Sequence, residues 1–501
     1  MALPDRVVHQ RALGQGHPHL RSSLLRETGS AHSRFRWRKR CHAAFPRNGW
    51  KAPCRVSFGP RFLWGSPLGR NTKGIRLVEI PEKVNHCVIV LATLDTKGVE
   101  AHYLRERLRS LGASPLLMDV SMRYGDRLVR ADISAEEVAF AAGSSLDELS
   151  NSSDLMATME TVVKGASQIV ARLMNEGKVE GVIGIGGYTG SSIITAVMHI
   201  LPFGFPKVMV SAAAGMRGVS NLFFDTSDII LFHSVLEISG LSAPVRNVLE
   251  RAAFALWAML CGPVTAPVVE TERALAVTMM SPCEHCARSV RFELTNQGFQ
   301  VIGFHANGVG DRAMEAMIGA GLFRGVIDLA PGAVADHLYK FIRDAGPNRL
   351  EGAGRLGVPQ IVSTCGMNHF TPPRYAWQSM PDRRRFELDR VRTWFRASPD
   401  ELVLIAETFA EKLNRSSGPV KVVIPLKGWS SIDRLGRPTY DPEEDRIFCG
   451  TVRDMLKKDI EVIEVDANME DPEFSAAVME AAEGFFEDGS RGTITPRKKA
   501  V

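Results

Sequence analysis

From residue 86 onward, short apolar segments with the pattern of a buried strand alternate with longer segments that have the apolar spacing of a helix. The first set is a strand pattern over 86–93, a helix pattern over 98–111 and a strand pattern over 115–121. Strands that alternate with helices are joined by crossover connections, and these connections place the strands parallel in one sheet. The alternation therefore predicts an α/β protein with mostly parallel sheets.

The alternation runs through the chain twice, with a linker pattern at 263–272 between the two runs. The first run ends with a long apolar helix pattern over 244–260, and the second begins with a strand pattern over 274–280. We expect two Rossmann-like subdomains, an N-terminal one over 83–265 and a C-terminal one over 271–487. Either one is long enough to bury a core of its own.

Within the two runs, a capping box of Ser134 and Glu137 marks one helix start, and a polar segment extends to Arg396. The further strands are predicted at 181–185, 207–211, 229–232, 300–305, 325–329, 360–364, 420–425 and 461–465. The further helices are predicted at 153–174, 192–200, 283–295, 311–320, 333–342, 399–413, 442–456 and 472–486.

The first 76 residues carry a large excess of positive charge, with 16 Lys or Arg against two acids, Asp5 and Glu27. Because the whole chain has a formal net charge of +5, the rest of it has one near −9. The basic stretch lacks an apolar period and contains many Pro and Gly, so we expect residues 1–82 to be a disordered leader. A start codon assigned too far upstream would explain it, and an Arg-rich organelle transit peptide is the alternative. Residues 488–501 are expected to form a polar, frayed tail.

Charge and hydropathy exclude two classes of partner. A nucleic-acid groove needs a concentrated basic face, which an acidic remainder does not supply. A membrane span needs about 18 uninterrupted apolar residues. The strongest candidate, 253–269, is broken by Gly262, Pro263 and Pro267. We therefore expect no nucleic-acid partner and no membrane insertion.

The eight cysteines do not follow a disulfide-scaffold pattern. Cys87 and Cys261 lie in apolar runs and are predicted to be buried thiols. We therefore expect a reducing compartment, the cytoplasm, or the mitochondrion if the leader is a transit peptide. Cys283 and Cys286 have C-x-x-C spacing without a second ligand pair, so no metal site is predicted, although a thiol at a helix start leaves a redox or nucleophilic role open.

A glycine-rich turn lies between a predicted strand at 181–185 and a predicted helix at 192–200. It reads Gly184-Ile185-Gly186-Gly187-Tyr188-Thr189-Gly190-Ser191-Ser192. Glycines let an anion approach backbone N–H groups, and the dipole of the following helix favours negative charge. Ser191 and Ser192 add hydroxyl donors. The spacing is neither the dinucleotide fingerprint nor the P-loop, so phosphate binding and a tight strand-to-helix turn are both open.

Three further groups follow predicted strands of the first half, where ligands of open α/β sheets collect. Asp95, Thr96 and Lys97 place a carboxylate, a hydroxyl and an ammonium in one turn, suited to phosphate, ribose or a magnesium-bound water, with a helix N-cap as the alternative. Asp119 follows the second strand, where an acid often contacts ribose. Ser211 begins a turn of small residues that a ligand could approach, or that simply packs tightly.

In the second half, His305 lies in another glycine-containing strand-to-helix turn, and Lys427 follows a later strand. A histidine or lysine at a strand end is suited to act as an acid, a base or a clamp for a charged group. His369 is a third such candidate. For each of these residues, a hydrogen-bonded or solvated side chain without a catalytic role is the alternative.

At these residues the chain resembles a known family, the Tm-1-like ATP-binding proteins, over roughly residues 88–486. The segments that carry the resemblance are Leu94-Asp95-Thr96-Lys97-Gly98, Gly184-Ile185-Gly186-Gly187, Pro206-Lys207-Val208-Met209-Val210-Ser211, Phe304-His305-Ala306-Asn307-Gly308, Ile424-Pro425-Leu426-Lys427-Gly428 and Glu464-Val465-Asp466-Ala467.

The resemblance implies two Rossmann-like subdomains, nucleotide binding in the first of them or between the two, and a homodimer, but no known reaction. The family more often has Ser-Gly-Gly-Thr where this chain has Tyr188-Thr189-Gly190-Ser191, and Thr-Thr-Pro where it has Ser281-Pro282. Both departures bear on how the nucleotide is placed.

These observations lead to two hypotheses. The first is an ATP-binding protein, with magnesium as an accompanying ion, in which 186–192 holds the phosphates and Asp95, Thr96 and Lys97 contact ribose or phosphate. The second is an enzyme acting on a small phosphorylated or carboxylated metabolite between the two halves, with His305 or Lys427 as acid, base or clamp. The sequence does not decide between binding and catalysis.

Overall fold

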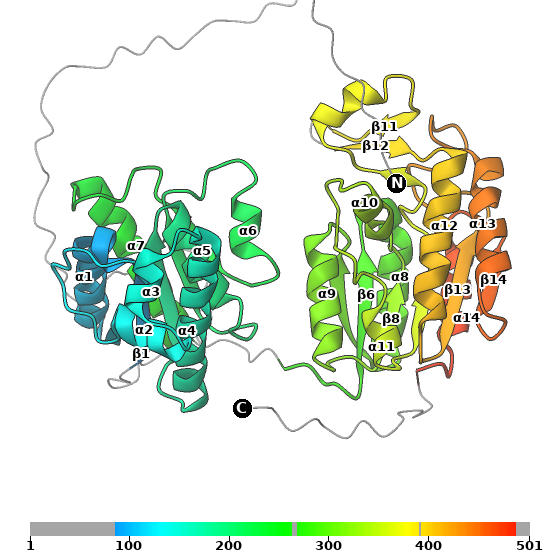
Figure 1. Cartoon of the computed structure of the whole chain (residues 1–501). Helices are drawn as coiled ribbons and strands as arrows, with labels where there is room; N and C mark the ends of the chain where they lie inside the picture. The colour runs from blue at the N-terminus through cyan, green and yellow to red at the C-terminus, as the bar shows by residue number, and fades with distance from the viewer. Residues whose placement is uncertain (1–85, 263–267, 390–391, 487–501) are drawn as a thin grey trace, which may run out of the picture. The chain divides into compact units, whose positions relative to one another are not determined.

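The computed structural model describes residues 86–262, 268–389 and 392–486 (Figure 1). They form two α/β domains, each built around a parallel sheet: a first domain over 86–262 and a second domain over 268–486. The predicted fold class is confirmed. The basic leader at 1–82 and the tail at 488–501 lie outside the described residues.

The first domain has a five-stranded parallel sheet with the order β2-β1-β3-β4-β5. The first strand, β1, lies inside the sheet and pairs with β2 on one side and with β3 on the other. Side chains alternate between the two faces along β1, since Val90 joins one core cluster and Ile89 the other. The strands are β1 Cys87–Ala92, β2 Ser114–Asp119, β3 Gly181–Gly186, β4 Lys207–Ser211 and β5 Ile230–His233.

Helices cover both faces of this sheet. Leu104 of α1 and Leu249 of α7 pack on one face, whereas Ile169 of α4 and Ile193 of α5 pack on the other. The predicted capping box that starts α2 is confirmed. The helices are α1 Leu94–Leu111, α2 Ala135–Ala141, α3 Leu146–Asn151, α4 Leu155–Asn175, α5 Tyr188–Met198, α6 Ser220–Phe224 and α7 Ala243–Cys261.

The second domain has a six-stranded sheet with the order β14-β13-β9-β8-β6-β7, in which every pair is parallel. As in the first domain, the first strand of the domain, β6, lies inside the sheet. The strands are β6 Ala274–Met279, β7 Gln300–His305, β8 Gly325–Asp328, β9 Gln360–Val362, β13 Val420–Pro425 and β14 Glu461–Val465.

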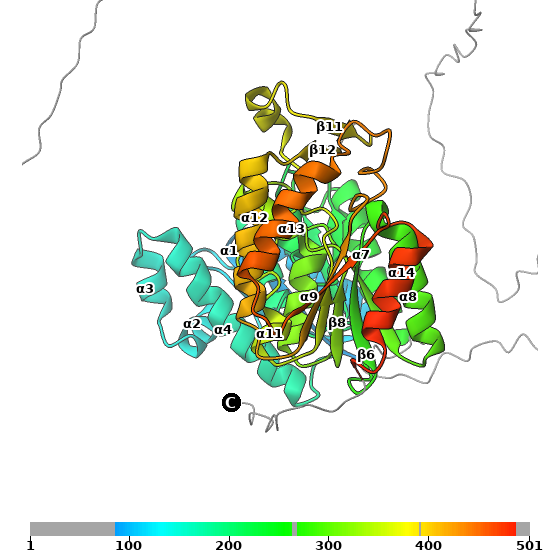
Figure 2. The same cartoon turned by 90° about the vertical axis from the view of Figure 1, so that its right-hand side faces the viewer.

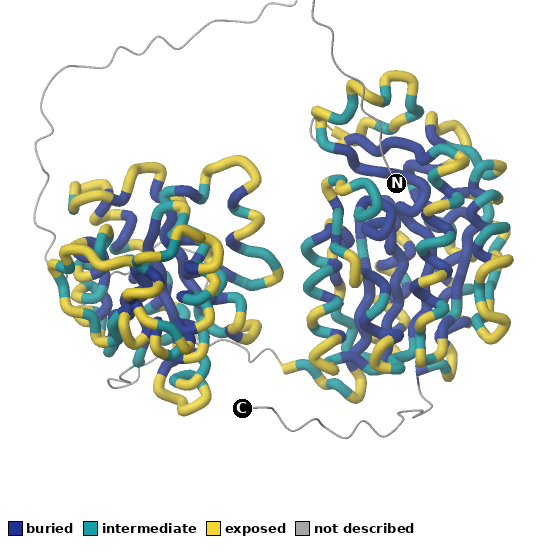
Figure 3. Tube along the Cα trace, in the orientation of Figure 1, coloured by how far each residue is buried: buried dark blue, intermediate teal, exposed yellow. Residues whose placement is uncertain are grey.

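Helices α8 and α14 lie side by side on one face of the second sheet, and α9, α12 and α13 cover the other (Figure 2). The buried residues of both domains are concentrated in the strands and on the inner sides of these helices (Figure 3). The helices are α8 Glu284–Asn296, α9 Val309–Gly319, α10 Ala333–Leu338, α11 Gly352–Arg355, α12 Pro399–Asn414, α13 Pro442–Met455 and α14 Pro472–Ala482, with short 3-10 turns at Ser281–Cys283 (η1) and Arg374–Ser379 (η2).

The segment before α12 forms a small antiparallel sheet, whereas the sequence suggested only a polar stretch. Its strand order is β10-β12-β11, with β10 His369–Phe370, β11 Arg385–Glu387 and β12 Thr393–Arg396. Phe370 and Phe395 of this sheet are buried, and Phe370 belongs to the core that β13 and α12 also form. Buried apolar side chains such as these attach the small sheet to the second domain, although the segment as a whole is rich in arginine.

Two cysteine predictions need correction. Cys87 and Cys261 are half-buried rather than buried, because each lies at the end of its element, the first residue of β1 and the last of α7. The six cysteines in the described ranges are all free thiols. Within those ranges, no helix has both the length and the apolar character needed to cross a bilayer.

Candidate functional site

The strand order of the first domain creates a switch point between β1 and β3. The chain leaves β1 through α1, which covers one face of the sheet, and leaves β3 through α5, which covers the opposite face. Where two neighbouring parallel strands send their chains to opposite faces, a crevice opens at their carboxyl ends, and open α/β sheets bind ligands there. The glycine turn and the Asp95 turn are the two segments that flank this crevice.

A cavity of about 480 Å³ lies at this switch point. It is lined by Thr93, Asp95, Thr96, Lys97, Met122, Arg123, Leu155, Gly187, Tyr188, Thr189 and Gly190. Two turns that are almost a hundred residues apart in sequence therefore form one site. The cavity brings together six of the predicted ligand-binding residues, namely Asp95, Thr96, Lys97, Gly187, Thr189 and Gly190.

The helix α5 that enters the cavity begins at Tyr188, four residues earlier than the sequence predicted. The first amides of a helix have no acceptor within the helix, and the N-cap Gly187 has no side chain to satisfy them. The first amide bonded along the helix is that of Ser191, which donates to the Gly187 carbonyl at 3.0 Å. The amides of Tyr188, Thr189 and Gly190 thus form a donor set suited to an anion.

The glycines of the turn have two different roles. A Cβ at Gly184 would lie 2.8 Å from Met209 Sδ, and one at Gly186 would lie 2.8 Å from the amide of Ser191, so these glycines allow β3 and α5 to pack closely. A Cβ at Gly187 would meet no atom within 4 Å. Because Gly187 also lines the cavity, a side chain there would occupy space that a ligand needs.

The turn after β1 is organised by its own side chains. Asp95 Oδ1 accepts hydrogen bonds from the hydroxyls of Ser121 at 3.2 Å and Thr96 at 3.3 Å. The N-cap of α1 is Thr93, so the alternative that Asp95 or Thr96 caps this helix is wrong. Lys97 donates from Nζ to Glu237 Oε1 at 2.9 Å and to the Ile238 carbonyl at 2.5 Å.

Five predicted ligand-binding residues lie behind the cavity wall instead of in it: Gly186, Asp119, Ser191, Ser192 and Ser211. Asp119 accepts from the Leu94 amide at 3.1 Å through Oδ1 and from Arg127 Nε at 2.5 Å through Oδ2. Ser191 is hydrogen-bonded to Ser211, and the Ser192 hydroxyl donates to the Tyr188 carbonyl at 3.0 Å. These side chains fix the two turns, and a direct contact to a ligand stays a prediction.

Three cavity residues were not anticipated: Met122, Arg123 and Leu155. Met122 and Arg123 follow β2, and Leu155 is the first residue of α4, so they approach from the β2 side of the switch point. Leu155 is 49% exposed and Tyr188 is also 49% exposed, which gives the mouth of the cavity apolar surface. No sequence motif identifies these residues, because they reach the cavity only through the strand order, and local sequence does not predict that order.

The second domain has an equivalent switch point between β6 and β8, but it is filled by protein. Met280 and Cys283 after β6 and Cys365 after β9 are all buried there, with Cys365 Sγ 3.7 Å from Met280 Sδ. Gly366 fits against Gly332, whose Cβ would lie 2.5 Å from the Gly366 carbonyl oxygen. At that point the described residues pack against one another.

The C-x-x-C pair belongs to the same buried region. Cys283 and Cys286 are almost fully buried. Burial raises the pKa of Cys286 well above the usual thiol range, with smaller contributions from Cys283 and Glu470. A reactive thiolate needs a lowered pKa and access to solvent, so this geometry does not favour a nucleophilic or redox role for Cys286.

The two catalytic candidates lie far apart in the second domain. His305 is the last residue of the edge strand β7, whereas Lys427 follows β13, and β6, β8 and β9 lie between these strands. At about 4.8 Å per strand, the two strand ends are roughly 19 Å apart. Lys427 donates to Asp466 Oδ2 at 2.8 Å, which raises the pKa of Lys427. The two side chains therefore do not share one site within this sheet.

His369 is part of a buried polar network in place of an open loop. Its Nδ1 lies 2.6 Å from Asn368 Oδ1, and the Asn368 amide donates to Asp433 at 2.8 Å and to Asp445 at 2.9 Å. Burial, followed by the charges of Arg396, Arg343 and Arg384, lowers the pKa of His369 well below its usual range. Through Asn368, the neutral ring of His369 in the small sheet is linked by hydrogen bonds to Asp433 and Asp445 of the main domain.

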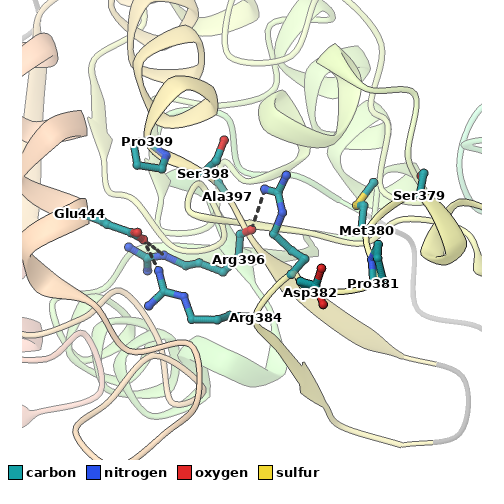
Figure 4. Close-up of a pocket in the computed structure, with 11 residues that line it drawn as sticks. Ser379, Met380, Pro381, Asp382, Arg384, Arg396, Ala397, Ser398, Pro399 and Glu444 are labelled. Carbon is teal, nitrogen blue, oxygen red and sulfur yellow. Dashed lines mark hydrogen bonds and ion pairs between the residues drawn. The ribbon is translucent and has the colours of Figure 1, made fainter.

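A second cavity, of about 410 Å³, lies between the small sheet and the start of α12 (Figure 4). Its arginines are already paired with carboxylates: Arg383 with Glu401, Arg384 with Asp441 and Glu444, and Arg396 with Glu444 at 3.3 Å. A phosphate at this place would have to compete with these pairs. The first-domain cavity, with its helix N-terminus, is the better candidate site.

Comparison with known proteins gives matches over both domains. The family model described as "Uncharacterised protein family (UPF0261) N-terminal domain" matches residues 86–264, and the corresponding C-terminal domain model matches 272–486. A UPF0261 protein of Clostridium tetani is 34% identical over 399 residues, which cover 79% of this chain and 98% of that protein. A UPF0261 protein of Brucella suis is 30% identical over 416 residues, covering 80% of this chain and 96% of that protein.

A plant relative is more distant. The ToMV resistance protein Tm-1 of Solanum lycopersicum is 26% identical over 416 residues, which cover 79% of this chain and 55% of that protein. The shared region thus accounts for about half of the plant protein. The predicted resemblance to Tm-1 proteins is therefore confirmed as a similarity in sequence.

Proposed function

The chain belongs to the uncharacterised protein family UPF0261, and we propose that its first domain binds ATP, with magnesium as an accompanying ion. One observation carries this proposal: a single cavity at the β1/β3 switch point is lined by both the glycine turn and the Asp95 turn. Nucleotides are typical ligands of this position in open α/β sheets.

The amino end of α5 is the proposed phosphate position. The amides of Tyr188, Thr189 and Gly190 have no acceptor within the helix, and Gly187 leaves room for close approach. Thr93 and Thr96 also line the cavity, and their hydroxyl oxygens lie 3.0 Å apart. The three amides thus offer neutral donors to an anion, in addition to any side-chain cation.

The remaining cavity residues suit the other parts of a nucleotide. The Asp95 carboxylate is positioned by Ser121 and Thr96, and it is suited to ribose hydroxyls or to a water of a magnesium ion. Met122 and Leu155 offer apolar surface for a base. A volume of about 480 Å³ is within the usual range for small-molecule sites.

Two further parts of the proposal rest on the sequence, the homodimer on the family resemblance and the location on the cysteine pattern. A homodimer is expected from that resemblance, and light scattering coupled to size-exclusion chromatography at several concentrations tests this. The cytoplasm is the proposed location, and fractionation of cells that express the tagged chain tests that. The proposal is one of binding, and the enzyme hypothesis gains nothing from the separate positions of His305 and Lys427.

Isothermal titration of the full chain with ATP and magnesium tests the central proposal. We expect a Kd below about 1 mM, and weaker binding would overturn the proposal. Gly187→Val should abolish binding without unfolding the protein, because its side chain would enter the cavity and meet no other atom. Gly450→Val is the matched control, since a Cβ at Gly450 also meets nothing within 4 Å but lies on α13 of the second domain.

A further inference from the structure

The ammonium group of Lys97 lies at the first-domain cavity but is already held by the protein. Its Nζ donates to Glu237 Oε1 at 2.9 Å and to the Ile238 carbonyl at 2.5 Å. Lys97 lines the cavity, whereas Glu237 reaches it from the loop after β5, outside the cavity lining. The positive charge that would attract a phosphate is therefore partly neutralised by a carboxylate.

Glu237 lies in an exposed loop segment, residues 235–237, which we call the arch, between the buried residues Ser234 and Ile238. At one end, Ser234 is buried and its amide donates to the Ser211 carbonyl at 3.2 Å; at the other end, Ile238 is buried in the core. The residues of the arch are exposed, and Val235 has a φ of +64°, a left-handed conformation that is unfavourable for a β-branched residue. The arch can therefore move without disturbing the core.

Lys97 would remain at the cavity if Glu237 were displaced. An ammonium has three donors, and the Ile238 carbonyl uses one of them from a buried position. Glu237, in contrast, is 67% exposed, so water can replace Lys97 as its partner. The side chain of Lys97 is only 13% exposed, but an ion pair with so exposed a carboxylate is weak. A phosphate with several charged oxygens is a stronger partner for the same ammonium.

We propose that Glu237 is an autoinhibitory carboxylate, which occupies Lys97 until a phosphate group of the ligand displaces it. The inference rests on the proposed nucleotide site and adds a regulatory element to it. Glu237 sets a threshold for entry, since only a ligand with enough negative charge exchanges places with it. Neutral nucleosides and weakly charged metabolites would leave the pair intact.

The same contact could instead serve only to hold the loop in place, and the structure argues against this. The loop has other attachments: the Gly240 amide donates to Glu100, and Ile238 packs in the core. Removing Glu237 therefore leaves the loop attached at both ends. The variant Glu237→Ala should fold, which makes the proposal testable.

The test compares ATP and tripolyphosphate binding by isothermal titration in wild-type protein, Glu237→Ala and Glu176→Ala, using the full chain at low ionic strength. Glu176 is the matched control, because it forms an exposed pair with Lys178 at 2.8 Å in the same domain, between α4 and β3 and therefore at the amino end of the strands, away from the cavity. Both variants remove one negative charge. Only Glu237→Ala releases a cation at the cavity.

We expect Glu237→Ala to bind both probes about two- to fivefold more tightly than wild type, the range of an exposed ion pair, with a difference that shrinks as salt is added. Glu176→Ala should match wild type, and the gain should disappear in Lys97→Met/Glu237→Ala. Wild type and Glu237→Ala binding ATP equally would overturn the autoinhibitory role and leave the nucleotide site in place. Absence of binding in both proteins would overturn the nucleotide site as well.

Discussion

The hydroxyl of Ser191 in α5 donates a hydrogen bond to the hydroxyl oxygen of Ser211 at the end of β4, at 2.7 Å. Both residues are fully buried. Ser191 had been predicted to donate to a phosphate and Ser211 to border a ligand, and in the structure the two hydroxyls bond to each other. The pair joins the first turn of α5 to the neighbouring strand, so it holds the amides of that turn in position.

Ser191→Ala should lower the free energy of unfolding by about 1 kcal/mol, because Ser211 loses a buried partner. Affinity for ATP should change by less than about threefold, since neither hydroxyl lines the cavity. Urea denaturation and titration calorimetry on the same preparation measure the two effects. A stable variant with greatly weakened binding would show that Ser191 contacts the ligand directly.

Gly184→Ala should lower the stability of the first domain, whereas Gly187→Ala should weaken ATP binding. At Gly184 the new methyl group would collide with Ile194 and Met209, and overpacking of this kind costs about 1–3 kcal/mol. At Gly187 the methyl group meets nothing within 4 Å and projects where a ligand would lie. Thermal denaturation should therefore detect the first change, and ATP titration the second. Equal melting temperatures for the two variants would contradict the close packing of β3 and α5.

Asp119→Asn should destabilise the first domain by about 2 kcal/mol, because the carboxylate accepts from the Leu94 amide and from Arg127, and an amide group would place a donor against a donor. Chemical denaturation measures the loss. The sequence suggested a contact of Asp119 with ribose. A variant of native stability that no longer binds ATP, yet still binds tripolyphosphate, would favour that earlier hypothesis.

Asp445 gives the second domain a pH-dependent stability. Burial, together with the charge of Asp433, raises the pKa of Asp445 to about 8, whereas an unfolded Asp titrates near about 4. Between these values the unfolded chain releases the proton and the folded chain keeps it. The free energy of unfolding should therefore fall as pH rises through this window, by up to about 1.4 kcal/mol per pH unit, and the loss should be complete above about pH 8.

Denaturation at pH 5, 6, 7 and 8, followed by tryptophan fluorescence, measures this slope. Asp445→Asn should flatten it, because the amide carries no proton to lose. Asp454→Asn is the control, since Asp454 is an exposed residue of the same helix, α13. Equal slopes for wild type and Asp445→Asn would contradict the raised pKa.

The strands were predictable because their signal is local. Short segments rich in Val and Ile located the strands at 207–211, 300–305, 420–425 and 461–465 with their observed bounds. In β4 and β13, which are buried along almost their whole length, few polar residues interrupt the pattern. The edge strands β7 and β14 were located although they contain Gln300, Glu461 and Glu464. The long helices were predicted for a similar reason, since their apolar spacing extends over several turns.

The start of α5 was missed because its first turn contains poor helix formers. Tyr188, Thr189, Gly190 and Ser191 all have low helix propensity, and the strand-to-helix packing overrides it. The strands of the small sheet were missed for another reason: they are two to four residues long. An alternating pattern cannot develop over so few positions.

The cavity was predictable only in part. Residues that follow β1 and β3 were identified because both turns carry recognisable chemistry. Met122 and Leu155 were not, because they reach the cavity only through the order β2-β1-β3, which depends on long-range pairing. The hydrogen bonds of Asp119 and Ser211 were hidden in the same way, since each partner lies on a different element.

Both domains have a switch point in their parallel sheet, but in the second domain the buried side chains of Met280, Cys283 and Cys365 occupy it. The two domains should therefore differ in how many ligands they bind. A duplicated scaffold alone would suggest two equivalents of nucleotide for each polypeptide. With one crevice open and the other closed by side chains, calorimetric titration should saturate at a molar ratio of one.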